Sequence, residues 1–513
     1  MSAAPNGGIC DGSQDSEASA QAMNLDRHSA SRNQASSGTS AGDPIPASIR
    51  PARTLGFRDL VLFYIVTGVS LRWIAVAAAA GPGSILVWLI AWITFYIPLA
   101  LSVVELSSRH PAEGGLYVWS KRAFGDFAGF ISAWSYWTSN LPYFPALLYF
   151  AASNALFIGG PRLQALASNR LYFLIFALVG LAIPTVLNVI GLNLGKWLNN
   201  LGAVGMWVPV LIVVALGVVS WHRYGSATHF TASNLMPSLH LQDLVFWSGL
   251  FYAFGGCEAA SFMGEEIKNP RRNIPRALLF AGVIVTFAYI AGTVFVLLAL
   301  PSGQVSDLQG LIQAVMITGP HLGFAALVPI VALLVTLSNL GQSGAFLAAT
   351  ARLPFVAGID HYLPRAFGSL HPRYKTPHVA IWTQSIIAAV FIFLGQAGTS
   401  VRGAYRVLVS MGVITYFVPY LFVFAAMIAL QREPAGADVI RVPGGKPTAI
   451  VLGAVGLATT TFTIFISAIP LPGEENKTLA VVKILGFTLI LLGVGVVLYW
   501  GAKTRAARAR RVP

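Results

Sequence analysis

The sequence contains few charged residues for its length. Of its 513 residues only 10% are Asp, Glu, Lys or Arg, whereas 56% are hydrophobic. Soluble domains carry roughly 25% charged residues, so a chain of this composition could not cover its surface as a water-soluble globule. Cysteine is also rare, with Cys10 in a polar stretch and Cys257 in an apolar one. This distribution argues against a structural disulfide.

Several functional motifs are absent as well. The sequence has no phosphate-binding Walker loop after a strand, which leaves ATP-driven transport by this chain unsupported. It has neither a His-Glu-x-x-His motif nor a paired-cysteine pattern for a metal ion. His110, His371 and His378 fall in loops, where contacts with the backbone are expected rather than metal ligation. We therefore expect neither a metal site nor a cofactor.

Long uncharged runs are present instead. Residues 171–190, 277–300 and 322–350 contain no charged side chain, and a helix that spans a bilayer needs roughly 20 apolar residues. Glycine and proline are frequent, with 50 and 29 residues, and membrane helices tolerate both. The sequence predicts an all-α integral membrane protein with twelve transmembrane helices, near residues 57–80, 84–107, 125–157, 171–190, 198–220, 241–264, 277–300, 318–350, 378–396, 404–430, 447–469 and 479–501.

The net charge of +14 could suggest a nucleic-acid partner, but the basic residues lie between the apolar runs. With the N-terminus placed in the cytoplasm, the cytoplasmic segments hold 25 Lys and Arg residues and the external loops hold 6. This bias follows the positive-inside rule. We therefore expect a multi-pass protein of the plasma membrane (the inner membrane if the source is bacterial) with both termini in the cytoplasm. We expect the protein to contact membrane lipid and not to bind nucleic acid.

Three stretches beside the predicted helices are typical of one family. The first is Glu105-Leu-Ser-Ser-Arg-His-Pro-Ala-Glu-Gly-Gly-Leu-Tyr-Val-Trp, between helices 2 and 3. The second runs from Phe251-Tyr-Ala-Phe-Gly-Gly-Cys-Glu258 to Gly264-Glu-Glu-Ile-Lys-Asn-Pro-Arg-Arg-Asn-Ile-Pro-Arg276. The third is Ala351-Arg-Leu-Pro-Phe, followed by His371-Pro-Arg-Tyr-Lys-Thr-Pro-His378. With Leu55-Gly-Phe, they resemble the amino acid–polyamine–organocation (APC) permease superfamily over about residues 55–430.

The resemblance implies a fold and a division of the chain. Ten core helices would form two inverted five-helix repeats, as in a leucine-transporter-like fold, and two further helices would follow. Helices 1 and 6 would be broken at mid-membrane with the substrate between them. The expected parts are a disordered cytoplasmic tail (1–50), a transport core (51–430), helices 11 and 12 (431–501) and a basic cytoplasmic tail (502–513).

The resemblance also implies where the substrate binds. In helix 6 the matching residues include the glycine pair of Phe254, Gly255, Gly256 and Cys257, which could permit unwinding or close helix packing. In helix 1 the family carries a small glycine-rich motif at the break. The corresponding positions here hold bulkier residues, and the expected site in this helix consists of Gly68, Val69, Ser70, Leu71 and Arg72.

Two ionisable residues are expected deep in the membrane, Arg72 and Glu258. An arginine near a helix centre costs roughly 2.5–3.5 kcal/mol on insertion scales, so it should face the interior and have a partner. We expect Glu258 to be that partner. The pair would be either a structural ion pair, or a functional one in which Arg72 meets a substrate carboxylate or controls protonation of Glu258.

Further candidates come from other helices. Tyr252 is a possible aromatic gate, and other pocket candidates are Tyr136, Trp137, Asn140, Ser338 and Asn339, although such aromatics also serve in packing. Glu265 and Glu266 are expected either to pair at an inner gate or to sit at a solvated helix end. Many proteins of this fold carry a lysine in the middle of helix 5 that replaces a sodium ion. The matching stretch here, 201–207, has none.

The main functional hypothesis is secondary transport of an amino acid across the membrane, as a symporter or an antiporter. A carrier of polyamines or other organic cations in the same superfamily is an alternative, and a fixed cation at Arg72 counts against it. A membrane-embedded enzyme or sensor is a third hypothesis. An enzyme would need clustered His, Asp or Glu on several helices, and only Arg72 and Glu258 lie deep in this chain. We therefore expect no enzymatic activity.

Overall fold

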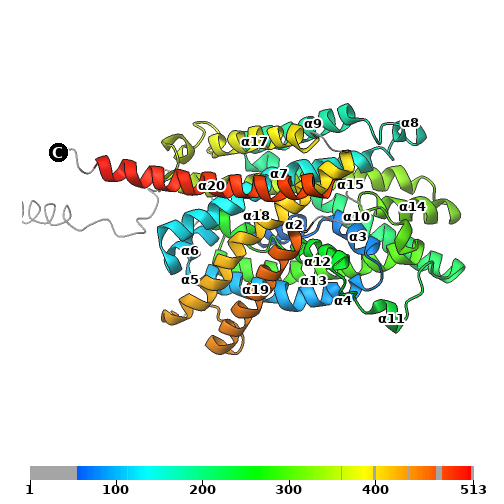
Figure 1. Ribbon diagram of the computed structural model, residues 1–513, viewed down its shortest axis with the longest axis horizontal. Helices are drawn as coiled ribbons and strands as arrows, with labels where there is room; N and C mark the ends of the chain where they lie inside the picture. The colour runs from blue at the N-terminus through cyan, green and yellow to red at the C-terminus, as the bar shows by residue number, and fades with distance from the viewer. Residues whose placement is uncertain are drawn as a thin grey trace, which may run out of the picture. The chain divides into compact units, whose positions relative to one another are not determined.

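Helices make up nearly all of the part of the chain that the structure describes. This computed structural model describes residues 55–111, 114–359, 361–396, 400–436, 439–469 and 476–509 (Figure 1). Within these ranges, pairing of the β type is confined to one isolated bridge between Leu55 and Ile267. The expected N-terminal tail and Cys10 lie outside the described residues. The description below concerns the unit formed by residues 51–513.

The first half of this unit contains two helices that are not regular α-helix throughout. The first membrane segment is split, and the second contains a π-helical turn at Trp92–Tyr96 just before Pro98. The α-helices in order are α2 (Phe57–Gly68), α3 (Leu71–Ala79), α4 (Ser84–Ala91), α5 (Ile97–Arg109), α6 (Leu116–Phe124), α7 (Asp126–Ala155), α8 (Pro161–Gln164), α9 (Arg170–Ile190) and α10 (Leu192–Tyr224).

The second half again begins with a split helix. Its first part is followed by a 3₁₀ segment, η3 (Ala259–Glu266), instead of an α-helix. The α-helices are α11 (Ala232–Leu235), α12 (Leu241–Ala253), α13 (Pro270–Ala299), α14 (Gly310–His321), α15 (Leu327–Thr350), α16 (Arg352–Ile359), α17 (His378–Gln396), α18 (Val401–Ala429), α19 (Gly445–Ser467) and α20 (Lys477–Ala509).

Ten helical segments among the described residues are long and apolar enough to cross a membrane. They are Phe57–Ala79, Ser84–Arg109, Arg170–Ile190, Asn200–Tyr224, Pro270–Ala299, Leu327–Val356, His378–Gln396, Val401–Arg432, Gly445–Ser467 and Lys477–Arg508. The two other expected spans correspond to α7 and to the interrupted α12–η3. In α7 almost every residue is buried, including Ser135, Thr138 and Asn140. An inward-facing helix can carry such polar groups, which lower its mean hydropathy.

The expected eighth helix was wrong in its extent. The sequence predicted one helix over 318–350, whereas α14 ends at His321 and α15 begins at Leu327. Gly323 lies between them with φ +83°, a left-handed conformation that glycine adopts without strain. Both helices are apolar, so hydropathy alone does not reveal this turn. The seventh helix also begins earlier than expected, at Pro270.

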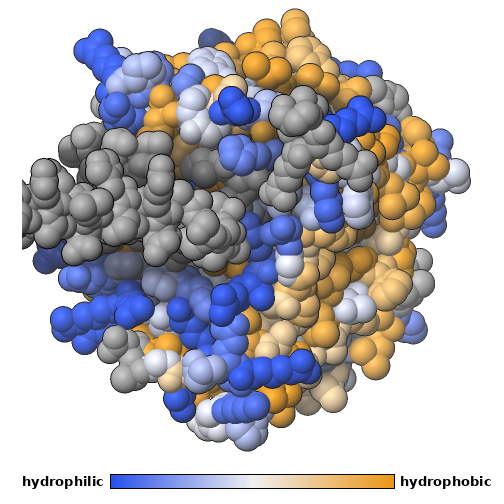
Figure 2. Space-filling model, turned by 90° about the vertical axis from the view of Figure 1, so that its left-hand side faces the viewer, coloured by the Kyte–Doolittle hydropathy of each residue, from blue (hydrophilic) through white to orange (hydrophobic). Residues whose placement is uncertain are grey.

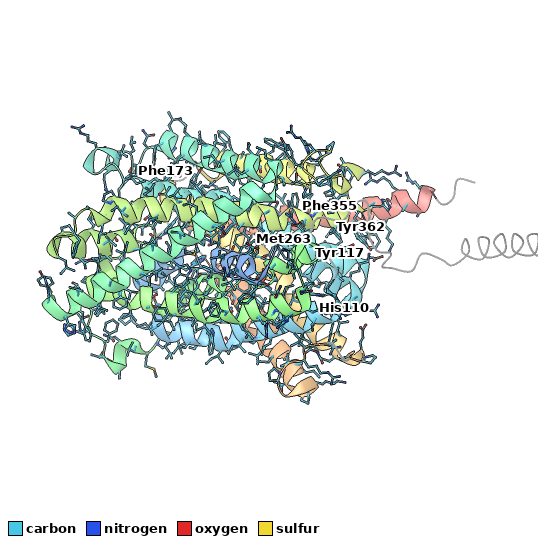
Figure 3. The ribbon with its side chains drawn as sticks, turned by 180° about the vertical axis from the view of Figure 1, so that it is seen from behind. His110, Tyr117, Phe173, Met263, Phe355 and Tyr362 are labelled. Atoms are coloured by element: carbon cyan, nitrogen blue, oxygen red, sulfur yellow. The ribbon has the colours of Figure 1, made fainter. Side chains whose placement is uncertain are left out.

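The helices run side by side, and their ends define two faces of the unit. In Figure 1, α6 and the C-terminal end of α20 lie at one end, whereas α8, α11 and α14 lie at the other. Hydrophilic side chains gather at the first of these ends, and hydrophobic ones extend along the flank (Figure 2). His110 and Tyr117 lie toward this same end, far from Phe173 (Figure 3).

Candidate functional site

Helix 1 is interrupted over two residues. Its first half, α2, ends at Gly68, and Val69 and Ser70 have extended backbone before α3 begins at Leu71. The expected site in this helix, residues 68–72, is longer than the interruption, because Arg72 already lies in the first turn of α3. Arg72 is therefore held on a helix and not on unwound backbone.

Helix 6 is interrupted where the sequence predicted it, between the end of α12 at Ala253 and the start of η3 at Ala259. Gly256 has φ +103°, and a Cβ atom there would lie 2.8 Å from the Thr67 carbonyl oxygen. A Cβ atom on Gly255 would lie 2.7 Å from the Tyr416 hydroxyl oxygen. The glycine pair thus permits both the unwinding and the close approach of helix 6 to helix 1.

Side chains from two other helices satisfy the backbone groups that the interruption of helix 1 frees. Nε2 of Gln342 in α15 donates to the Val66 carbonyl at 2.7 Å and to the Val69 carbonyl at 2.6 Å. The Tyr289 hydroxyl of α13 accepts from the Ser70 N–H at 3.0 Å. It also lies 3.0 Å from the Gly68 carbonyl and 3.1 Å from the Ala253 carbonyl, so it joins the two interruptions. Unwound backbone at this depth requires such partners.

A small cavity lies between the two interrupted helices. Its empty volume is about 290 Å³. Its walls come from helices 1, 3, 6, 7, 8 and 10 and combine aromatic rings with hydroxyl and amide groups. The lining residues are Thr67, Gly68, Ser70, Trp73, Asn140, Tyr143, Tyr252, Ala253, Gly255, Tyr289, Gln342, Phe346 and Tyr416.

The structure contradicts the expected ion pair between Arg72 and Glu258. Arg72 is 1% exposed, and its guanidinium carbon lies 4.4 Å from the ring centre of Trp73 and 4.9 Å from that of Tyr143. Tyr252 lies at 6.0 Å. Nε and Nη1 of Arg72 are buried and have no hydrogen-bond partner. Aromatic faces attract the cation, but among the described residues no carboxylate forms an ion pair with it.

Glu258 is held by tyrosines. The Tyr136 hydroxyl of α7 donates to Oε1 at 2.5 Å, and the Tyr416 hydroxyl of α18 donates to the same oxygen at 3.0 Å. Oε2 of Glu258 is buried without a hydrogen-bond partner. The carboxyl group is fully buried and connects the interrupted helix 6 to helices 3 and 10. Both of these hydrogen-bond partners are tyrosine hydroxyl groups. Glu258 and Arg72 therefore lie in separate surroundings and do not form the expected ion pair.

Only some of the remaining predicted residues line the central cavity. Tyr252 and Asn140 line the cavity with Gly68, Ser70 and Gly255, whereas Val69, Leu71, Phe254 and Cys257 are buried at the interruptions. The hydroxyl of Ser338 and the amide of Asn339 both bond to the Val335 carbonyl of their own helix, and neither residue lines the cavity. Trp137 donates to Gln384 at 3.0 Å, away from the cavity.

Buried ion pairs close the end of the molecule that carries α6. Glu266 is the last residue of η3. It pairs with Arg352 at 2.7 Å, and both side chains are almost inaccessible, so the alternative of a solvated helix end is wrong for Glu266. The side chain of Glu265 lies outside the described residues. The Leu55 N–H and carbonyl bond to Glu266 and Lys268, which ties the start of α2 to the end of helix 6.

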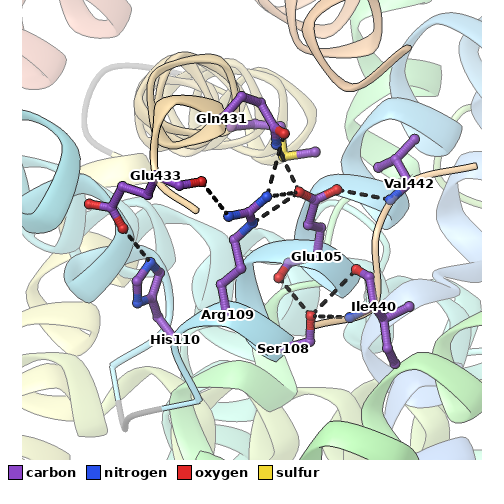
Figure 4. Close-up of polar contacts among 9 residues, drawn as sticks. Glu105, Ser108, Arg109, His110, Gln431, Glu433, Ile440 and Val442 are labelled. Carbon is purple, nitrogen blue, oxygen red and sulfur yellow. Dashed lines mark hydrogen bonds and ion pairs between the residues drawn. The ribbon is translucent and has the colours of Figure 1, made fainter. Parts of the chain in front are cut away.

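A second polar network at this end centres on Glu105 of α5 (Figure 4). Oε1 pairs with Arg109 at 2.7 Å and accepts from Gln431 at 2.8 Å. Oε2 accepts from the Val442 backbone N–H at 2.9 Å. The network joins helix 2 to the end of helix 10 and to the segment before α19. Glu105 opens the first of the family-like stretches, and this geometry shows what its carboxylate holds.

A larger cavity lies toward the opposite end, between α3, α12 and α18, with an empty volume of about 490 Å³. Asp307 lines it and pairs with Arg402 at 2.7 Å and with Arg406 at 3.1 Å. Trp73 lines both this cavity and the central one. Its indole ring therefore stands between the two.

Sequence reasoning missed several residues of the site. Gln342, Tyr289, Tyr143 and Tyr416 all line the cavity, and each comes from a helix without a recognisable motif at that position. A glutamine in an apolar helix is a weak signal by itself, because it can bond within its own helix. Only the three-dimensional arrangement shows that Gln342 reaches across to helix 1.

The comparisons with known proteins agree with this architecture. A family model for amino acid permeases matches residues 55–494. The chain is 27% identical to an uncharacterized transporter of Legionella pneumophila over 82% of this chain and 90% of that protein. It is 23% identical to a probable agmatine/putrescine antiporter of Lactococcus lactis over 82% and 89%. It is 26% identical to a glutamate/serine transporter of Bacillus subtilis over 84% and 77%.

The family match covers most of the chain and includes both interrupted helices. Relatives that match over more than four fifths of the chain are named as transporters. The chain therefore belongs to the amino acid permease family, within the APC superfamily of membrane transporters.

Proposed function

We propose that this protein is a secondary transporter of amino acids, with the substrate bound between the interrupted helices 1 and 6. The observation that carries the proposal is the buried guanidinium of Arg72, which has two nitrogen atoms without hydrogen-bond partners. Arg72 does not itself line the central cavity, but its guanidinium packs against Trp73, Tyr143 and Tyr252, which do. A buried cation without a counter-charge is costly, and a substrate carboxylate would supply that charge. Arginine suits this role because its planar fork can bind both carboxylate oxygens.

The cavity also offers acceptors for an ammonium group. Oε1 of Gln342 and Oγ of Ser70 are buried and unpartnered, and both residues line the cavity. These acceptors line the cavity, and the unpaired donors of Arg72 lie behind its aromatic wall, so the two sets together would complement a zwitterion.

The relatives named above include carriers of amines as well as of amino acids. Arg72 favours the second class, because a fixed cation beside the cavity repels a substrate that carries only positive charge. Among the lining residues, no carboxylate is present to bind an amine. A polyamine carrier remains the alternative that the experiment below must exclude.

We propose that the chain forms the expected two inverted five-helix repeats, with α19 and α20 as extra helices. The order of elements supports this proposal, because it occurs twice. An interrupted helix, a long helix, a short helix, a long helix, another short helix and two long helices follow one another. In the first half these are α2/α3, α4–α5, α6, α7, α8, α9 and α10, and in the second they are α12/η3, α13, α14, α15, α16, α17 and α18. The proposal counts α7 and α12–η3 as membrane spans in addition to the ten helical segments above, which gives twelve transmembrane helices.

We propose that the end that carries α6 faces the cytoplasm together with both termini, and that the membrane is the plasma membrane. The cytoplasmic excess of basic residues expected under the positive-inside rule supports this orientation. The ion pairs of Glu266 and Glu105 would close the path at this inner end. On the other side, Trp73 lines both the central cavity and the larger one. Transport by alternating access would require these contacts to open in turn. A cysteine introduced by Arg508→Cys in a chain without native cysteines should react with an impermeant thiol reagent only after permeabilisation.

Glu258 is the proposed coupling residue. It is fully buried next to the unwound backbone of helix 6, and its hydrogen-bond partners are hydroxyl groups that can bind either the acid or the carboxylate. A proton could therefore be taken up or released there during the transport cycle. Coupled symport and exchange both fit this arrangement.

Counterflow by purified protein in proteoliposomes tests the proposed function. Vesicles loaded with one unlabelled compound are offered labelled amino acids and labelled polyamines in parallel. We expect accumulation of one or more amino acids and none of the polyamines. Accumulation of a polyamine alone would overturn the assignment of the substrate, and no accumulation of either class would overturn the assignment of transport.

A further inference from the structure

The side-chain amide of Gln342 donates hydrogen bonds to two backbone carbonyl groups at the interruption of helix 1. It is 1% exposed, and both hydrogens of its NH₂ group are used, one for the Val66 carbonyl and one for the Val69 carbonyl. These two carbonyls lack their usual helical partners. Val66 would accept from Ser70, whose N–H instead bonds to Tyr289, and Val69 would accept from Trp73, whose N–H bonds to Ser70.

Unwound carbonyl groups in the middle of a transporter are the ligands that a coupling cation takes. Two such oxygens converge here on a single point, and a neutral amide nitrogen occupies it. An amide neither titrates nor dissociates in the physiological pH range. The donor therefore stays in place whatever the concentrations of sodium ions and protons.

The packing of helix 5 adds a second observation. A Cβ atom on Gly202 of α10 would lie 2.8 Å from the Cα atom of Gly341, and one on Gly205 would lie 3.0 Å from the Ser338 backbone nitrogen. Helix 5 thus packs directly on the backbone of α15, next to Gln342. At these two positions helix 5 has no side chain that could bring a charge to the interruption. Among the residues that line the neighbouring cavity, the titratable ones are tyrosines, Tyr143, Tyr252, Tyr289 and Tyr416.

We propose that Gln342 is a built-in, uncharged substitute for a coupling cation at the interruption of helix 1. Transport by this protein is accordingly independent of sodium, and any proton coupling passes through another group. The part of this inference that concerns coupling rests on the proposed transport function. The part that concerns the structure does not, because the amide stabilises helix 1 whether or not substrate is present.

The orientation of the amide has a consequence for the substrate as well. Because Nε2 is fixed on two carbonyl oxygens, Oε1 must point away from them, and it is buried without a partner. Gln342 therefore serves as a positioning residue for helix 1 and presents an acceptor on the side of the cavity.

The substitution Gln342→Glu tests the proposal. A protonated carboxyl can still donate to one of the two carbonyls, whereas the ionised form repels both unless a cation enters. The thermal stability of this variant should fall as the pH rises, and added sodium should restore part of it. Wild-type protein and the variant Ser343→Ala should show no sodium-dependent stabilisation, because the Ser343 hydroxyl bonds only within its own helix.

Two measurements decide the outcome. The first is the melting temperature of each protein in sodium, potassium and choline chloride across pH, without substrate. The second is wild-type uptake with an inward sodium gradient or with choline in its place, which we expect to be equal. A sodium-dependent rise in the wild-type melting temperature, or uptake driven by the sodium gradient, would overturn the proposal. If Gln342→Glu does not fold, the wild-type measurements still decide. If the substrate assignment fails, the melting experiment is unaffected.

Discussion

The Tyr136 hydroxyl lies 2.5 Å from Oε1 of Glu258, so a residue of helix 3 closes on the unwound part of helix 6. This contact fixes a carboxyl group that no cation neutralises among the described residues. Arg72 takes no part in it, because its guanidinium lies against aromatic rings instead. The two deep ionisable residues therefore have distinct surroundings and can have distinct roles.

Removal of the Tyr136 hydroxyl should weaken this contact. The variant Tyr136→Phe leaves Oε1 of Glu258 with the hydrogen bond from the Tyr416 hydroxyl, and loss of a buried hydrogen bond to such a group costs about 1–3 kcal/mol. We expect a lower melting temperature in detergent. Tyr224→Phe is the matched control, because its hydroxyl bonds to the His321 carbonyl on an exposed surface. Equal melting temperatures for the two variants would contradict a structural role for the contact.

A substitution of Glu258 should distinguish proton-coupled uptake from exchange of substrate. The variant Glu258→Gln keeps the shape of the side chain and removes its titration. We expect it to retain exchange of substrate across proteoliposomes but to lose uptake driven by a pH gradient. Uphill uptake that still follows the pH gradient in this variant would exclude Glu258 as the coupling residue.

The polar network at the inner end should contribute strongly to stability. Glu105 is 1% exposed, and it holds Arg109, Gln431 and the Val442 backbone N–H. Loss of one partner of a buried ion pair costs roughly 3–5 kcal/mol, so Glu105→Ala should lower the melting temperature markedly. The exposed pair of Lys121 and Asp126 provides the control, since Asp126→Asn should change the stability by less than about 1 kcal/mol. Similar losses in both variants would argue against a special role for the network.

His110 beside this network should make stability depend on pH. Burial lowers the pKa of His110, and the charges of Arg122 and Arg109 lower it further, while Glu433 opposes the change. The folded protein thus binds this proton less readily than the unfolded chain. The stability should fall as the pH drops below about 6.5, the usual pKa of histidine. His110→Gln should remove this component, which the difference between the two melting curves measures across pH. A pH profile unchanged by the substitution would show that other groups cause it.

The helical architecture was largely accessible from the sequence, because long apolar runs are visible in the order of the residues. The interruption of helix 6 was predictable from Gly255 and Gly256, since glycine is the signal for unwound or closely packed backbone. The turn at Gly323 was not, because the runs on both sides of it are apolar. Hydropathy does not distinguish one long helix from two.

The site was harder to predict because its chemistry depends on contacts across the chain. The sequence showed that Arg72 is deep and needs a partner, but the rings that hold it come from α3, α7 and α12. The pairing with Glu258 followed from charge alone, and the tyrosines that hold Glu258 come from α7 and α18. Gln342 could not be singled out, because its role depends on two backbone oxygens that only the interruption of helix 1 exposes.

The most direct test concerns recognition of a carboxylate by Arg72. Counterflow should be measured with labelled amino acids, each beside the amine that remains when its α-carboxylate is removed, such as arginine with agmatine. Wild-type protein should accumulate an amino acid but not its amine. Arg72→Met should keep the melting temperature, because it removes an unpaired buried charge, and should lose substrate binding worth about 2–5 kcal/mol. Accumulation of the amine by wild-type protein, or undiminished amino acid counterflow by Arg72→Met, would contradict the account.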